Sequence, residues 1–227
     1  MVRRFLWLLN CLLLVPAVAQ LGSYHEGIST TAQKLDSITL LLNRDFSKQK
    51  AEFSNGLGMA LIEIPTGTIE KWEVDKNNPS HLVWEHKNGT PRIVQYLGYP
   101  GNYGAIAATN MLRTKGGDGD ALDVLVLGPP LPRGSWHMVR PIGILYMHDN
   151  GEKDDKIIAV IPEMPPFGGL MDIEQLDSQF PGVSSIIKTW FKHYKGPESS
   201  IQIQGFGKDR DAWKAIDAGL LKSSEKE

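Results

Sequence analysis

Short runs in which apolar and polar side chains alternate, or in which β-branched residues gather, make up most of the chain from Met59 onward. Each run is bounded by a turn that contains Gly, Pro or Asn, which is the pattern of a β-strand. The runs lie at 60–65, 71–76, 81–86, 92–97, 121–128, 138–149 and 156–162. Because so many strands follow one another at close spacing, the sequence predicts a closed or partly closed β-barrel.

Helical spacing of apolar residues appears only late in the chain. In residues 181–196 it predicts one apolar face, made of Val183, Ile186, Ile187, Trp190, Phe191 and Tyr194. A strand at 200–206 follows, and then a second helix at 211–221 with one side made of Trp213, Ile216 and Leu220. We therefore expect an α+β protein, mainly β, with an OB-like barrel and helices packed outside it.

Residues 20–58 precede this strand-rich region and have a different pattern. Leu35, Ile38, Leu41 and Leu42 fall partly at helical spacing, and a polar stretch follows them. We expect a short helix and a linker here, with no assigned chemistry. The expected organisation is a leader at 1–19, this N-terminal extension at 20–58 and a catalytic domain at 59–223.

The first 19 residues have the three parts of a secretory signal peptide: two arginines, an apolar run at 5–14 and an A-x-A cleavage site that ends at Ala19. The apolar run is shorter than the roughly 20 residues that cross a bilayer, so an uncleaved membrane anchor is the weaker alternative. A lipoprotein site at Cys11 is a minor alternative, because larger residues precede this cysteine. We expect an exported protein, periplasmic or secreted, with no membrane association after cleavage.

Composition adds two limits to this picture. The 227 residues carry 24 Lys and Arg against 26 Asp and Glu, a formal charge of −2, so no broad basic face for nucleic acid is expected. Cleavage after Ala19 removes two arginines and no acidic residue, which changes that charge to −4. It also removes Cys11, the single cysteine, so packing or bound ligands, and not disulfides, would stabilise the mature chain.

Three carboxylates crowd into residues 116–129, GGDGDALDVLVLGP, just before an apolar strand. Asp118, Asp120 and Asp123 repel one another unless protons or cations neutralise them. Oxygen ligands of this kind suit hard cations, magnesium or calcium, and not zinc. A solvated acidic turn is the alternative for such a motif in isolation. An EF-hand calcium loop is excluded, because the motif lacks Gly at its sixth position and Glu at its twelfth.

A second acidic group surrounds an Asn-Gly turn in residues 147–160, MHDNGEKDDKIIAV. Asn-Gly between two apolar runs predicts a β-hairpin. Side chains alternate along a strand, so Asp154 and Lys156 are expected on the same face. A charged hairpin tip is the alternative when this segment is taken alone. Together with Asp149, the segment offers a second set of carboxylates for a metal cluster that faces an anion.

Six segments between residues 59 and 207 carry a family resemblance. They are ALIEIP, EKWEVDK, TPRIVQYLGYPGNYGAI, DGDALD, MHDNGEKDDK with its D-x4-D-x-K spacing, and FKHYKG with its Tyr-Lys pair. In this order they resemble the segments of the soluble family I inorganic pyrophosphatases, including the signature D-G-D-P-L-D. Ala121 stands where that family usually has Pro. Asp155 is an additional acid, which leaves open whether Asp154 or Asp155 is the metal ligand.

The resemblance implies metal-dependent hydrolysis of pyrophosphate to two phosphates, with Asp120 as the general base. The implied metal ligands are Asp118, Asp123, Asp149 and Asp154. The implied substrate contacts are Lys71, Arg92, Tyr103, Lys156, Tyr194 and Lys195, and the supporting residues are Glu63, Glu73 and Tyr99. It also implies several Mg²⁺ ions per site, with Mn²⁺ or Zn²⁺ as substitutes and Ca²⁺ as an inhibitor, and a homo-oligomer.

Some of these positions have plainer interpretations when taken singly. Tyr194 fits a core tyrosine on the apolar face of its helix, and Lys71 fits an exposed lysine on an edge strand. Glu63 lies between two isoleucines, where a carboxylate needs a partner. Two other functions stay open: an exported hydrolase of other phosphoanhydrides, such as nucleotides or polyphosphate, and a non-catalytic relative that binds metal or phosphate.

Overall fold

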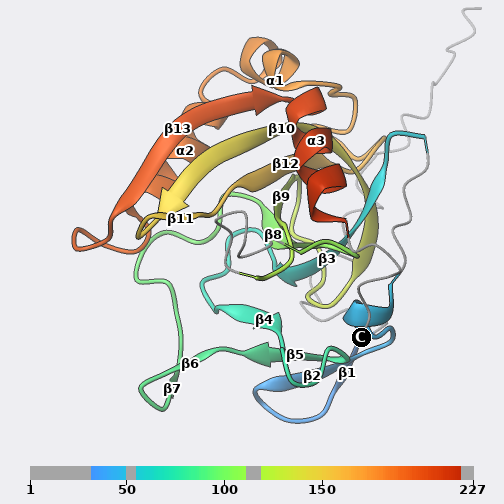
Figure 1. Cartoon of the computed structure of the whole chain (residues 1–227), viewed down its shortest axis with the longest axis vertical. Helices are drawn as coiled ribbons and strands as arrows, with labels where there is room; N and C mark the ends of the chain where they lie inside the picture. Colours follow the sequence, from blue (N-terminus) through green and yellow to red (C-terminus); the bar gives the residue numbers. More distant parts are fainter. Residues whose placement is uncertain (1–31, 50–54, 111–118, 221–227) are drawn as a thin grey trace, which may run out of the picture.

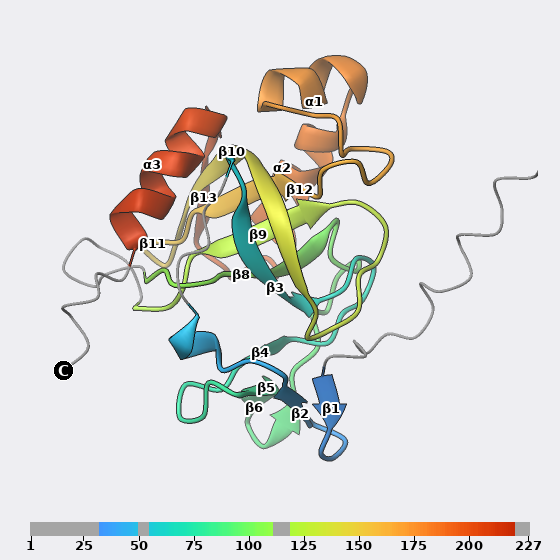
Figure 2. The same cartoon turned by 90° about the vertical axis from the view of Figure 1, so that its right-hand side faces the viewer.

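A closed ring of strands forms the centre of the molecule. The computed structural model describes residues 32–49, 55–110 and 119–220. The ring runs through β3 (Gly58–Ile64), β8 (Asn102–Ile106), β9 (Asp123–Leu127), β12 (Lys156–Val160) and β10 (Trp136–Asp149). Residues 136–139 of β10 pair with residues 58–61 of β3 and so close the ring (Figure 2). The predicted OB-like barrel is confirmed.

The barrel strands are buried almost throughout. Every residue of β3, β8 and β12 is buried, which explains why their sequences contain so few polar positions. β3 and β8 approach so closely that a Cβ on Gly104 would lie 1.8 Å from the carbonyl oxygen of Leu61. Glycine at this position therefore sets the distance between β8 and the strand that carries Glu63.

The long strand β10 also extends the same sheet outside the closed ring. It pairs with β13 (Ile201–Lys208) beyond the ring and forms a hairpin with β11 (Glu152–Lys153). The hairpin turn has positive φ at Asn150 (50°) and Gly151 (87°), as expected for an Asn-Gly turn. The predicted hairpin is confirmed.

The N-terminal extension forms strands and not the expected helix. Residues 32–49 contain β1 (Ala32–Lys34), β2 (Thr39–Leu42) and a single 3-10 turn, η2 (Phe46–Lys48). In β2, burial alternates so that Leu40 and Leu42 face inward, which is a period of two and not the helical period of 3.6. Leu35, which the helical spacing grouped with them, is 47% exposed. The helix prediction was wrong, because pairing with a distant strand decides the structure of this segment.

That distant strand belongs to a second, smaller sheet below the barrel (Figure 1). Its strand order is β1-β2-β5-β4, with β5 at His81–Trp84 and β4 at Trp72–Val74. Leu40, Leu42, Trp72 and Leu82 of this sheet pack with Leu61 of the barrel in one buried cluster. The extension therefore supports β4. This strand carries Glu73 and directly follows Lys71.

One predicted strand is absent from the part of the chain that the structure describes. Residues 92–97 contribute only a single bridge, between Ile93 and Glu70. Leu97 is 73% exposed, so the apolar residues of this run do not form one buried face. The hairpin strands β6 (His86–Lys87) and β7 (Thr90–Pro91) come directly before the run.

In the part of the chain that the structure describes, three α-helices lie outside the barrel, and all follow β12 (Figure 1). The two predicted helices are present as α2 (Val183–His193) and α3 (Asp209–Gly219), and a short helix, α1 (Ile173–Gln179), precedes them. α2 buries Ile187, Trp190 and Phe191, whereas Ile186 is 61% exposed and does not join the predicted apolar face. No helix among the described residues is long and apolar enough to cross a membrane.

Candidate active site

One cavity of about 530 Å³ gathers residues from segments that are far apart in the sequence. Walls come from both sheets, from the hairpin after β10 and from the end of α2. The predicted site residues that line it are Glu63, Lys71, Glu73, Arg92, Tyr103, Asp120, Asp123, Asp149, Asp154, Lys156, Tyr194 and Lys195. Tyr99 lies behind this surface, and Asp118 falls outside the described residues.

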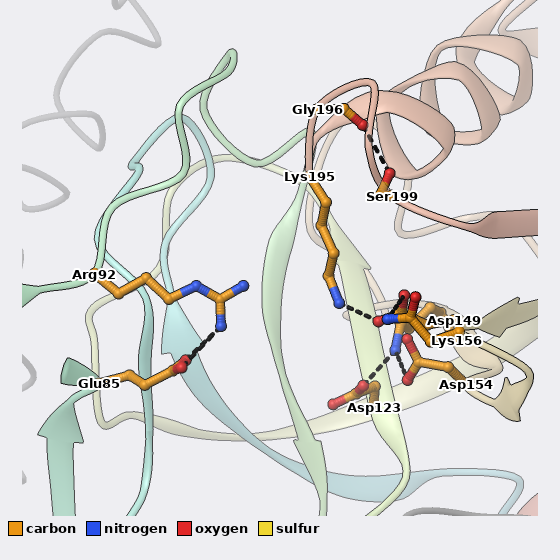
Figure 3. A network of polar contacts seen from close by, with 10 residues as sticks. Glu85, Arg92, Asp123, Asp149, Asp154, Lys156, Lys195, Gly196 and Ser199 are labelled. Carbon is orange, nitrogen blue, oxygen red and sulfur yellow. Dashed lines mark hydrogen bonds and ion pairs between the residues drawn. The ribbon is translucent and has the colours of Figure 1, made fainter. Parts of the chain in front are cut away.

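Lys156 lies at the centre of the carboxylates. Its Nζ is 2.5 Å from Oδ2 of Asp123 and 2.5 Å from Oδ1 of Asp154 (Figure 3). Strand pairing produces this contact, because β9 and β12 run parallel with Lys156 in register with Asp123. Asp154 lies two residues before Lys156, on the same face of the chain, as the alternation of side chains predicted.

The ammonium of Lys156 does not fully neutralise the two acids that it touches. Burial raises the pKa of Asp154, although Lys156 acts in the opposite direction. Burial also acts to lower the pKa of Lys156, but Asp123 and Asp154 outweigh it and keep that pKa above its ordinary value. Two carboxylates and one ammonium leave a net negative charge in a partly buried place, which favours the binding of a further cation.

The structure separates the roles of the adjacent acids Asp154 and Asp155. Asp155 is 3% exposed and faces away from the cavity. Its Oδ1 accepts a hydrogen bond from the backbone N–H of Met147 at 3.1 Å, and Lys153 is its ion-pair partner. Asp155 therefore fixes the hairpin, while the side chain of Asp154 faces Lys156 and the cavity.

A second ion pair closes the wall next to this cluster. Lys195, just after the end of α2, donates a hydrogen bond to Oδ2 of Asp149 at the end of β10 (Figure 3). Its ammonium also lies 5.6 Å from the centre of the Tyr194 ring. The end of α2 thus brings a lysine and a tyrosine to the carboxylates of the barrel.

Glu63 is a buried acid at an irregular point of β3. The register between β3 and β8 shifts between Ile62 and Ile64, and such a bulge turns the side chain of the extra residue. Glu63 is 5% exposed, and its Oε1 accepts a hydrogen bond from the N–H of Val74 at 3.1 Å. Burial raises its pKa to about 8, against the opposing effect of Lys71.

Lys71 is the cation of this wall. Burial acts to lower its pKa, but the acidic groups around it, Tyr99 first and Glu63 next, keep the pKa above its usual value. Its Nζ lies 3.6 Å from Glu73 and 5.8 Å from the centre of the Tyr103 ring. Lys71 therefore stays charged at neutral pH and is not the exposed edge-strand lysine of the plainer interpretation.

Three tyrosines form a layer between the cavity and the core. The ring of Tyr99 lies 5.1 Å from that of Tyr103 and 6.5 Å from that of Tyr194. Burial raises the pKa of each of them. Tyr103 and Tyr194 reach the cavity surface, so their neutral hydroxyl groups can donate hydrogen bonds to an anion there.

Asp120 also lines the cavity, on the turn that contains Gly119. The φ of this glycine is 88°, a conformation that other residues rarely adopt. The two oxygens of Asp120 lie 2.7 and 2.9 Å from Nζ of Lys76. This pair is solvent-accessible, since the side chain of Asp120 is 45% exposed, so the carboxylate can be reached by water.

Comparison with known proteins identifies the family to which this arrangement belongs. The family model described as inorganic pyrophosphatase matches residues 60–223. The chain belongs to the inorganic pyrophosphatase family. The predicted resemblance is thereby confirmed.

Relatives of this pyrophosphatase family chain occur in fungi and algae. The inorganic pyrophosphatase of Kluyveromyces lactis is 30% identical over 204 residues, which cover 78% of this chain and 71% of that protein. Soluble inorganic pyrophosphatase 2 of Chlamydomonas reinhardtii is 36% identical over 164 residues, covering 70% of this chain and 77% of that protein.

Solved structures of the family share the fold. The inorganic pyrophosphatase from Schistosoma japonicum has a TM-score of 0.71 at 31% identity and covers 80% of this chain and 73% of that one. The N-terminally truncated vacuolar soluble pyrophosphatase of Trypanosoma cruzi, solved in complex with PPi, has a TM-score of 0.67 at 29% identity. The match covers 76% of this chain and 70% of that chain.

Membership of the pyrophosphatase family implies the use of divalent metal ions, and the carboxylate oxygens of the cavity suit such ions. Oxygens of Asp123 and Asp154 converge on a single point that the ammonium of Lys156 occupies. Oxygen donors of this kind are what hard divalent cations prefer. Within residues 32–49, 55–110 and 119–220, no three metal-ligating side chains meet at one point. Asp118, another metal ligand that the family resemblance implies, lies outside those ranges.

Several cavity residues have no counterpart in the sequence-based prediction. Phe46 and Ser47 of η2 and Lys76 line the cavity, and Glu85 contacts Arg92 from behind it. The sequence assigns no chemistry to residues 20–58, so no signal pointed to Phe46 and Ser47. Lys76 is the last residue of the EKWEVDK segment, but its type and position gave no chemical reason to select it.

Proposed function

We propose that this chain hydrolyses inorganic pyrophosphate to two phosphates. The observation that carries the proposal is one cavity with two kinds of wall, a carboxylate cluster around Lys156 and a set of cations and hydroxyls around Arg92. A substrate that is a polyanion and needs cations for its hydrolysis matches both walls. Family membership supports the same substrate.

The cations and hydroxyls of the cavity would bind the two phosphate groups. The planar guanidinium of Arg92 can donate hydrogen bonds to two phosphate oxygens, whereas Lys71 and Lys195 act as point charges. Tyr103 and Tyr194 add neutral donors, because burial keeps their hydroxyls protonated. Phosphoryl transfer depends mainly on such positioning and charge neutralisation.

The reaction itself breaks one phosphoanhydride bond. The oxygen of a water molecule forms a bond to one phosphorus, the bond from that phosphorus to the bridging oxygen breaks, and the second phosphate leaves with the bridging oxygen. The proton of the attacking water goes to Asp120, which is solvent-accessible and lines the cavity. Lys156 and the neighbouring cations stabilise the negative charge on the leaving phosphate.

Divalent cations would be held by Asp123, Asp154 and Asp149, with Asp118 as a further ligand. Such cations neutralise phosphate charge and activate water for attack. We propose Mg²⁺ as the ion in use, because oxygen-only ligands favour hard cations. Mn²⁺ or Zn²⁺ as substitutes and Ca²⁺ as an inhibitor are proposed on the family resemblance alone.

Release of phosphate from pyrophosphate tests this proposal. The chain from Gln20 onward would be assayed with Mg²⁺, with Ca²⁺ and with EDTA, beside the variants Asp120→Asn and Asp177→Asn. Asp177 lies exposed on α1, so its variant controls for the loss of one surface charge. We expect Mg²⁺-dependent turnover that only Asp120→Asn reduces, by about a hundredfold or more. If the chain binds metal and pyrophosphate without turnover, the correct function is the alternative one, a non-catalytic protein that binds metal or phosphate.

We also propose that the protein acts outside the cytoplasm, as a homo-oligomer. The basis for export is the pattern of residues 1–19, which lie outside the described residues. Expression of the full chain in a bacterium, followed by fractionation and N-terminal sequencing, tests export. Recovery of an uncleaved chain in the cytoplasm would contradict it, and light scattering of the purified chain would give the oligomeric state.

A further inference from the structure

Glu85 and Arg92 form an ion pair at the edge of the cavity. Both carboxylate oxygens of Glu85 lie 2.8 Å from the same nitrogen, Nη1 of Arg92 (Figure 3). Arg92 lines the cavity, whereas Glu85 does not. Within the described parts of the chain, no other side chain bonds the guanidinium. The donors on Nε and Nη2 are therefore available for a ligand in the cavity.

Backbone hydrogen bonds fix this pair relative to Lys71. The N–H of Arg92 donates to the carbonyl of Glu85 at 2.7 Å, and the N–H of Glu85 donates to the carbonyl of Lys71 at 2.8 Å. The N–H of Lys71 donates in turn to the carbonyl of Arg92 at 3.0 Å. The indole N–H of Trp84 also donates to the carbonyl of Arg92, at 2.8 Å. The backbone of Glu85 is thus tied to those of Arg92 and Lys71, and this places its carboxylate beside the guanidinium.

The location of the pair explains why a partner is needed. Glu85 and Arg92 flank the hairpin of β6 and β7, which is exposed along its whole length. The side chain of Arg92 is only 27% exposed and has to extend from the base of that hairpin into the cavity. A long arginine side chain loses rotamer freedom when it is held in one direction. The carboxylate of Glu85 supplies the contact that selects this direction.

We propose that Glu85 is a positioning residue that holds the guanidinium of Arg92 toward the cavity, so that Nε and Nη2 meet a phosphate group of the substrate. The proposal rests on the proposed function for the identity of the phosphate. Glu85 touches neither the substrate nor the reacting atoms, and it acts only through Arg92. The carboxylate of Glu85 is paired with Nη1, so it holds the arginine in one direction. The same pairing partly neutralises the positive charge of Arg92.

The test is a double-mutant cycle with Glu85→Ala and Arg92→Ala. We expect Glu85→Ala to raise KM for pyrophosphate between about tenfold and a hundredfold with a smaller change in kcat, because the displaced group binds substrate. In the Arg92→Ala background, removal of Glu85 should have no further effect on KM. Glu85→Gln, which keeps an acceptor for Nη1, should be intermediate. Glu174→Ala on α1, which removes an exposed ion pair with Lys208 of β13, serves as the control.

Two further readouts separate this proposal from the proposed function. Calorimetric titration with methylenediphosphonate, a non-hydrolysable diphosphonate, in Mg²⁺ measures binding without turnover. If this probe does not bind, the proposed function fails, and the Nε–H NMR signal of Arg92 then tests positioning alone. We expect a single ordered signal in the unmutated chain and an averaged one in Glu85→Ala. An unchanged NMR signal in Glu85→Ala would overturn the positioning role. So would a lower KM in this variant, or effects of the two substitutions on KM that simply add in the double mutant.

Discussion

Lys156 and Asp123 lie opposite each other in the parallel pair of β12 and β9, with Nζ of the lysine 2.5 Å from Oδ2 of the aspartate. Lys156 is 1% exposed and has Asp154 as a second partner at the same distance. The lysine therefore occupies the point on which two carboxylates converge. Its charge and a divalent cation serve the same purpose at this place, which is to keep two acids ionised side by side.

Removal of the Lys156 charge should make stability depend on divalent cations. We expect Lys156→Met to lower the free energy of unfolding in EDTA by about 3 to 5 kcal/mol, because two partly buried carboxylates lose their partner. Added Mg²⁺ should restore more stability to this variant than to the unmutated chain. Urea unfolding with and without Mg²⁺ measures both effects. Lys208→Met, which removes a half-exposed lysine, is the control, and equal stability of the two variants in EDTA would contradict the prediction.

Asp154 and Asp155 should separate into a ligand and a structural residue. We expect Asp154→Asn to weaken Mg²⁺ binding at least about tenfold with little change in stability, because its side chain faces the cavity. Asp155→Asn should instead cost about 1 to 3 kcal/mol of stability, since it disturbs a buried acceptor for the Met147 N–H. Calorimetric Mg²⁺ titration and thermal unfolding distinguish the two. Equal losses of Mg²⁺ affinity in both variants would show that the assignment is wrong.

Glu63 should make the folded state less stable as the pH rises. Burial raises its pKa to about 8 in the folded protein, from an ordinary value of 4.5. The folded state therefore keeps a proton that the unfolded state releases, and stability falls between pH 4.5 and pH 8. In the unmutated chain, we expect the free energy of unfolding to fall by an amount on the order of 3 kcal/mol between about pH 5 and pH 8. In Glu63→Gln, this fall should be absent. Urea unfolding in EDTA across this range measures it, and the same pH slope in both proteins would refute the prediction.

The N-terminal extension should stabilise the site wall formed by β4. Leu40 is 2% exposed and packs with Trp72 of β4 and Leu82 of β5. We expect Leu40→Ala to cost about 2 to 5 kcal/mol of unfolding free energy and to reduce activity at temperatures where β4 loosens. Leu35→Ala removes a leucine that is 47% exposed from the same extension, so it should change stability by about 0.5 kcal/mol or less. Similar losses in the two variants, measured by thermal unfolding, would mean that the buried cluster does not stabilise the domain.

The barrel and the late helices could be predicted from the sequence because their patterns are local. The short apolar, β-rich runs of β3, β9 and β12, the Asn-Gly hairpin turn and the apolar face of α2 all depend on neighbouring residues. The segments that match the pyrophosphatase family keep their residues in a fixed order, so Asp123, Asp154 and Lys195 could be selected without coordinates.

Features that depend on distant partners could not be predicted in this way. The extension has leucines at both helical and strand spacing, and only its pairing with β5 made it a strand. Arg92 was selected from its segment, but its partner Glu85 is an ordinary acid until the chain brings the two together across a hairpin. The choice between Asp154 and Asp155 likewise depends on which face of the hairpin meets the cavity.

The sequence by itself therefore determined the family, the barrel and the types of residue at the site, since these follow from local periodicity and from motif order. The tertiary structure alone decided which of these residues meet: Lys156 with Asp123, Lys195 with Asp149, and Glu85 with Arg92. The reason is physical, because an ion pair depends on separations of a few ångströms in space. Sequence separation does not fix those distances until strand register and packing are set.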